Sequence, residues 1–204
     1  MKKIIAALLV VVCVFTLVAC DSKDYEKANT LFAQGQYDEA RAIYVELGDY
    51  EDSAEKIKAC DYAKANQLME AGEYAQAAEL FEALGDYVDS ADLLVKCRTQ
   101  EIDALLQGTW KNTALWTASI GQQFTFENGR VTADMLLNGK VSLSNVGDYR
   151  IALDEQIVYV CYDYIIGTTG KTPNTEEKKL FNFTYDGETF VLKMDSTDNL
   201  MEKK

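Results

Sequence analysis

The chain has 204 residues, of which 48% are hydrophobic types, and its formal net charge is −13 because 33 acidic residues face 20 basic ones. A body this acidic is repelled by nucleic acid and by anionic lipid headgroups, which argues against nucleic-acid binding and against attachment to a membrane through a basic face. Histidine is missing from the sequence, so histidine-based catalytic triads, histidine metal sites and the usual general base at neutral pH are excluded.

The first residues have the pattern of an export signal. Lys2 and Lys3 give a basic start, and the run from Ile4 to Ala19 is apolar apart from Thr16. A bilayer-spanning helix needs about 20 apolar residues, and this run is shorter. We therefore expect residues 1–19 to be a signal peptide that is not part of the fold.

The end of this run, Leu17-Val18-Ala19-Cys20, resembles the lipobox of bacterial lipoproteins. The resemblance implies cleavage just before Cys20, lipidation of its thiol, and a short tether over residues 20–24. It places the protein on the extracytoplasmic face of the cell membrane, since two or three acyl chains hold a protein there where one binds only marginally. Ordinary secretion, with a cysteine at the cleavage site by chance, is the alternative.

Two regions of different composition follow. Residues 21–107 are rich in alanine, lack proline and carry 20 acidic against eight basic residues, whereas residues 108–204 are rich in Thr, Val, Phe and Tyr. The first composition favours helix and the second favours strand. We therefore predict an α+β protein with a helical domain over residues 25–107 and a β domain over residues 108–204.

The helical region contains an internal repeat. LGDYEDSAEK at residues 47–56 returns 37 positions later as LGDYVDSADL at residues 84–93, and the alignment extends over both units. A fixed period of this size indicates a repeat architecture, and apolar spacing within each unit is helical. The predicted helices cover 23–34, 37–47, 53–71, 74–84 and 90–107.

Each unit carries the same spaced motif. Gly35-x-Tyr37-x-x-Ala40-x-x-x-Tyr44-x-x-Leu47 and its copy from Gly72 to Leu84 resemble the turn and second helix of a tetratricopeptide repeat. The resemblance implies antiparallel α-hairpins in a short array. The period of 37 in place of 34, and the missing proline after the second helix, depart from that family's pattern.

The repeated acidic phrase is predicted to join one helix to the next. Gly48 and Gly85 stand where a helix end favours a left-handed residue. Asp52 and Asp89 stand where a carboxylate can cap the following helix, and the tyrosine of each phrase is expected to pack across the corner. A calcium loop is the alternative, although such loops usually place more oxygen ligands at alternate positions.

From Gly108 the period changes to two, as in Phe124 and Phe126 or Phe181 and Phe183, and Asn-Gly and Asp-Gly pairs separate the runs. We predict seven or eight antiparallel strands in meander order, closed into a barrel or a strongly curled sheet. Gly108-Thr109-Trp110 resembles the Gly-x-Trp of lipocalin-like barrels, in which the tryptophan plugs the base. The resemblance implies an interior that takes a small apolar ligand; the alternative is that aromatic side chains fill it.

The stretch GTTGKT at residues 167–172 is not a phosphate-binding loop, because Ile165 stands where that motif requires glycine. We expect a solvated loop over residues 167–177. Cys60 and Cys97 occupy equivalent repeat positions and are expected to be small buried side chains rather than a disulfide. Cys161 is expected to be a buried strand residue without a basic activator rather than a nucleophile.

Together these features predict a membrane-anchored, non-catalytic binding scaffold without metal or cofactor. A protein or peptide partner, favoured to be basic by the acidic surface, is expected on the helical array, with Tyr25, Tyr62 and Glu70 as candidate contacts. The alternative is a carrier of a small apolar ligand that uses the β domain.

Overall fold

The computed structural model describes residues 21–167, 170–197 and 199–204. The chain divides into two compact units between Cys97 and Arg98. This division lies ten residues before the boundary expected from composition, because the last turns of helix α5 (Ser90–Leu106) contribute Ile102 and Leu106 to the core of the second unit.

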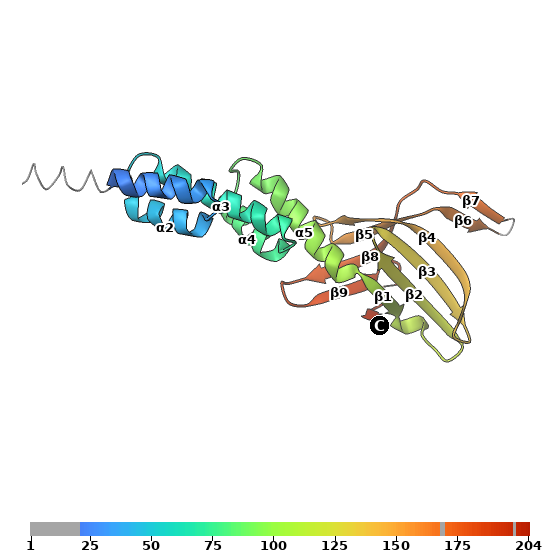
Figure 1. The fold of residues 1–204 in the computed structure, drawn as a ribbon. Coiled ribbons are helices and arrows are strands. Elements are labelled where there is room, and N and C mark those ends of the chain that lie inside the picture. The colour runs from blue at the N-terminus through green and yellow to red at the C-terminus, as the bar shows by residue number, and fades with distance from the viewer. Residues whose placement is uncertain (1–20, 168–169, 198) are drawn as a thin grey trace, which may run out of the picture. The chain divides into compact units, whose positions relative to one another are not determined.

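Helices make up the first unit, at the positions that the sequence predicts. Residues 21–33 are helical, and α2 (Tyr37–Leu47), α3 (Ser53–Glu70), α4 (Tyr74–Leu84) and the start of α5 follow. Two ion pairs, Arg41–Asp61 at 2.7 Å and Lys64–Asp38 at 2.8 Å, show that α2 and α3 run antiparallel. Figure 1 shows these short helices side by side.

Two small cores hold the helical unit, and one is a copy of the other. The first contains Ala28, Ala40, Tyr44 and Cys60, and the second contains the residues 37 positions further on, Ala65, Ala77, Phe81 and Cys97. Small alanines allow the helices to approach, and the ring of Tyr44 or Phe81 fills the remaining space. The duplication seen in the sequence is therefore a duplication of packing.

An antiparallel sheet forms the second unit (Figure 1). Within the described residues eight strands pair in the order β10-β1-β2-β3-β4-β5-β8-β9, and an isolated bridge between Lys193 and Leu200 brings β9 back to the start of β10. The sheet is thus a nearly closed barrel in meander order, and the predicted α+β class is confirmed. Its strands are β1 (Gly108–Asn112), β2 (Ile120–Glu127), β3 (Arg130–Leu137), β4 (Lys140–Ala152), β5 (Ile157–Tyr162), β8 (Lys178–Tyr185), β9 (Phe190–Met194) and β10 (Met201–Lys203), with a 3-10 turn η1 (Thr113–Leu115) after β1.

The prediction of a loop over residues 167–177 is partly wrong. β6 (Tyr164–Gly167) and β7 (Gly170–Pro173) pair as a separate two-stranded hairpin between β5 and β8. Ile165 and Ile166 are β-branched and favour a strand. Pro173 ends β7, a position in which a strand tolerates the missing N–H.

Aromatic rings fill the middle of the barrel. Phe124, Phe126 and Phe181 are fully buried, and the Phe181 ring packs edge-on against the other two with centroids 4.9 and 5.6 Å apart. Such pairs stabilise a core beyond the area that they bury. In this part of the barrel, aromatic side chains therefore fill the interior and leave no space for a ligand.

The base of the barrel is closed by Trp110 and the end of α5. The Trp110 side chain is 5% exposed and donates its Nε1–H to the Leu106 carbonyl at 2.7 Å, while Lys203 Nζ donates to the Leu105 carbonyl at 2.9 Å. The last carbonyls of a helix have no partner within the helix, so these two side chains satisfy them. The expected burial of Trp110 at the base is confirmed.

Candidate functional site

A tyrosine on the first helix of each helical hairpin contacts the acidic phrase that follows the second helix. The hydroxyl of Tyr25 donates to the Asp52 carboxylate, and that of Tyr62 donates to the Asp89 carboxylate at 2.5 Å. The expected capping role of Asp52 is wrong, since its side chain makes no capping bond to α3. The carboxylate is used instead by a hydroxyl 27 residues earlier in the chain.

The other parts of the phrase behave as expected. Gly48 and Gly85 end their helices with φ values of 59° and 58°, which favour glycine. The rings of Tyr50 and Tyr87 pack edge-on against Tyr25 and Tyr62 respectively, each pair with centroids 5.8 Å apart. The phrase is a joint between helices, built twice.

This joint includes two of the three residues proposed as partner contacts. Tyr25 and Tyr62 are partly buried in different cores, and their hydrogen bonds to aspartate raise the pKa of each phenol. Glu70 is exposed at the last residue of α3. The structure thus gives both tyrosines a role in stability, and their contact with a partner stays a prediction.

Replacing Tyr62 with phenylalanine is expected to destabilise the helical unit by about 1 kcal/mol, because Asp89 loses its donor while the packing against Phe81 and Tyr87 remains. Thermal and urea unfolding measure the change. Tyr74→Phe, which removes a hydroxyl beside the same core, is the control and should stay within about 0.5 kcal/mol. Equal effects of the two changes would show that the Tyr62–Asp89 hydrogen bond does not stabilise the helical unit.

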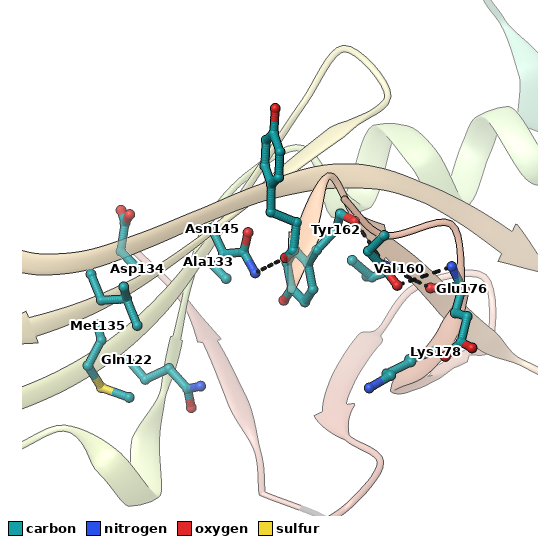
Figure 2. A pocket seen from close by; sticks show the side chains of 12 residues that line it. Gln122, Ala133, Asp134, Met135, Asn145, Val160, Tyr162, Glu176 and Lys178 are labelled. Carbon is teal, nitrogen blue, oxygen red and sulfur yellow. Dashed lines mark hydrogen bonds between the residues drawn. The ribbon is translucent and has the colours of Figure 1, made fainter. Parts of the chain in front are cut away.

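The barrel unit has a cavity of about 310 Å³ at the end away from α5. Figure 2 shows side chains that line it. Phe126 of β2 pairs with Gly108, directly after the helix, whereas Gln122 of the same strand lies further along and lines the cavity. Strands β2 to β6, the segment before β8, and β8 itself supply the lining. Its residues are Gln122, Ala133, Asp134, Met135, Leu143, Asn145, Val160, Tyr162, Tyr164, Asn174, Glu176 and Lys178.

Hydrogen bonds fix the polar groups around this cavity. The buried Asn112 donates its Nδ2–H to Gln122 Oε1 at 2.8 Å, which holds the amide of Gln122 in place. Asn174 donates to the Tyr162 carbonyl at 2.9 Å, and Asn145 donates to the Tyr164 carbonyl at 3.3 Å (Figure 2). Burial raises the pKa of Tyr162 to about 12, so its phenol is neutral under physiological conditions. The cavity therefore presents amides and a phenol beside apolar groups, and the charged residues Asp134, Glu176 and Lys178 also line it.

Large apolar side chains stand exposed around the same end, and we call them the apolar rim. Cross-strand pairs place Ile120 opposite Leu137 and Met135 opposite Leu143, and Met135 and Leu137 are alternate residues of β3, so these four side chains adjoin on one face. Contiguous exposed apolar groups on a soluble domain are typical of a binding surface. The rim consists of Ile120, Met135, Leu137, Val141, Leu143 and Tyr164, between 37% and 55% exposed.

The structure offers little support for reactive chemistry. In the described part of the chain no group of three or more acidic or cysteine side chains is arranged to hold a metal ion. Cys60, Cys97 and Cys161 are free thiols, and burial raises the pKa of Cys60 to about 11, which keeps that thiol unreactive. The absence of catalysis stays a prediction.

A scan against protein-family models, and searches of curated proteins and of solved structures, found no match. Among the helices of the described residues, none combines the length and apolar character that a membrane span needs. Cys20 and the signal peptide predicted before it lie outside the described residues. The cavity and the apolar rim were not predicted from the sequence. The alternation in each strand identifies side chains that point inward, but it does not show at which end of the barrel they leave a cavity.

Proposed function

We propose that the protein is a lipid-anchored, non-catalytic binding protein of the extracytoplasmic membrane face, and that it holds a protein or peptide partner at the open end of its barrel. The observation that carries this proposal is the apolar rim around a cavity whose polar groups are already held in place. Buried hot spots at protein interfaces form in such apolar settings with a polar border. Residues 108–204 carry 13 acidic against ten basic residues, a small acidic excess that favours a neutral or basic partner.

The rest of the chain fits this role. The lipobox-like sequence ending at Cys20 supplies the anchor. The duplicated helical cores support a tetratricopeptide-like array of antiparallel hairpins, and the meander barrel closed by Trp110 supports a lipocalin-like β domain. On this proposal the tyrosine–aspartate joints stiffen the array, and the principal binding surface lies on the barrel.

Carriage of a small apolar ligand is a second candidate, and the cavity favours it. Its volume of about 310 Å³ is at the lower end of the range of ligand pockets, because Phe124, Phe126 and Phe181 fill the interior below it. A carrier should retain a small molecule during native mass spectrometry of the intact protein. A protein-binding site should retain no small molecule, so this measurement distinguishes the two candidate functions.

The proposed function is tested with variants used as bait. The anchored protein, extracted in detergent, should retain its partner from solubilised envelope, and Leu137→Glu should abolish retention by placing a charge in the rim. Val45→Glu on α2 is the matched control, because Val45 is 52% exposed and Leu137 is 53% exposed. Loss of retention with Val45→Glu alone would move the partner to the helical unit and overturn the proposal.

A further inference from the structure

Strand β4 is longer than the strand that covers its outer edge. It pairs with β3 along residues 140–148, but its pairing with β5 starts only at Gly147. Asp163 N–H donates to the Val146 carbonyl at 2.8 Å, and beyond that point the chain turns away into the β6–β7 hairpin. Figure 1 shows this hairpin leaving the barrel while β4 continues along β3. Among the described residues, the backbone of residues 140–145 forms no hydrogen bond on this side, although the Asn145 side chain donates to the Tyr164 carbonyl of β6 at 3.3 Å.

The free edge presents main-chain hydrogen-bonding groups. In an antiparallel strand, alternate residues direct their N–H and C=O to the same side. Since Val146 uses its carbonyl on the outer side, Ser144 directs its N–H and C=O to that side as well. The Ser144 hydroxyl donates to Asp134 at 2.7 Å and so leaves the edge clear. Unpaired strand edges are templates for another strand.

The cavity adjoins this edge on one face of β4. Leu143 and Asn145 both line the cavity, and they are alternate residues of the strand. A strand added beside β4 would place its own same-face side chains about 5 Å from them, over the cavity. The site thus offers backbone partners for affinity and a pocket for alternate side chains, which is the pattern of peptide recognition by strand addition.

Two features make a second copy of this chain an unsuitable occupant. Lys140 stands at the start of the free edge, and the pairing with β3 carries a bulge between Met135 and Leu136. A lysine and a bulge are common devices that discourage two identical edges from pairing, because both copies carry them, whereas a different segment brings neither to the pair. Two copies, each with a net charge of −13, would also repel.

We infer that an extended segment of a protein partner, with apolar side chains at alternate positions, binds as an added strand along residues 140–145 of β4 and inserts one of these side chains into the cavity. The inference rests on the proposed function and specifies how the partner is held. A small apolar ligand would leave the main-chain groups of the edge unpaired, whereas a strand satisfies them.

The test uses the acylated full chain in detergent micelles and a displayed library of random 12-residue peptides as the probe. The selected peptides should alternate apolar and polar residues. Ser144→Pro removes the outward N–H and should weaken binding at least tenfold, whereas Ser144→Ala, which loses the same hydroxyl bond to Asp134, should stay within about twofold. Methylation of alternate peptide nitrogens provides a second measurement that leaves the protein unchanged, and it should weaken binding only at every other position.

The strand-addition inference would be overturned if the selected peptides bind Ser144→Pro as tightly as the wild-type protein, and if their N-methylated forms bind the wild-type protein as tightly as the unmethylated peptides. If such peptides still lose binding to Leu143→Asp, the open end remains the site and only the mode of binding is wrong. If the selection returns no peptide that depends on Leu143, the proposed function fails together with the inference. Circular dichroism should show that Ser144→Pro folds, because the lost N–H does not pair with β3.

Discussion

Replacing Trp110 with alanine is expected to lower the free energy of unfolding of the barrel unit by about 3–5 kcal/mol. The side chain is almost fully buried beside Leu106 and packs edge-on against Phe190 with centroids 5.8 Å apart. Its loss opens a cavity at the base and leaves the Leu106 carbonyl without its donor. A small domain has about 5–15 kcal/mol in total, so urea unfolding should show a large shift in midpoint.

Two further substitutions separate packing from hydrogen bonding at this position. Trp110→Phe keeps a ring but loses the Nε1–H donor, and is expected to destabilise by about 1–3 kcal/mol. Trp116→Ala removes a tryptophan that is 36% exposed and lies 4.9 Å from the Lys111 ammonium, and it should have a smaller effect than Trp110→Ala. Equal losses from Trp110→Ala and Trp116→Ala would contradict the closing role of Trp110.

Replacing Cys20 with serine is expected to abolish lipidation completely. In a lipobox the cysteine thiol forms the thioether, and the hydroxyl of serine does not substitute for it. Cells fed an alkyne-bearing fatty acid should label the wild-type protein and leave Cys20→Ser at background. A thioether-linked diacylglycerol brings two acyl chains, and each buried CH₂ contributes about 0.8 kcal/mol to membrane binding.

Cys161→Ser is the control for this experiment, because it also removes one thiol from the chain but lies in strand β5. Its labelling should equal that of the wild-type protein. Labelling of Cys20→Ser at the wild-type level would show that the sequence before Asp21 is not a lipobox.

The helices and most strands were predictable because their signals are local. Helical spacing and the copy at 37 positions place α2 and α4 at the residues observed, with Gly48 and Gly85 at their ends. Strict alternation identifies the inward side chains of β2 and β8, such as Phe124 and Phe181. One buried face and a period of two leave little freedom of register.

The features that escaped prediction depend on pairs of residues far apart in the chain. The Tyr25 hydroxyl reaches Asp52 only after a helical hairpin has formed, so the aspartate alone was interpreted as a helix cap. The β6–β7 hairpin was obscured because glycine and threonine are frequent in the sequence of residues 167–172. The free edge of β4 depends on where β5 ends and the chain turns away, which a one-strand pattern does not show.

Site-specific photo-crosslinking in the native envelope tests the central claim most directly, namely that the open end of the barrel holds the partner. A photoreactive residue at Leu143, which is 47% exposed, is compared with one at Val45, which is 52% exposed on the helical unit. A discrete crosslinked protein is expected from position 143 and none from position 45. A crosslink from position 45 with none from position 143 would contradict this claim.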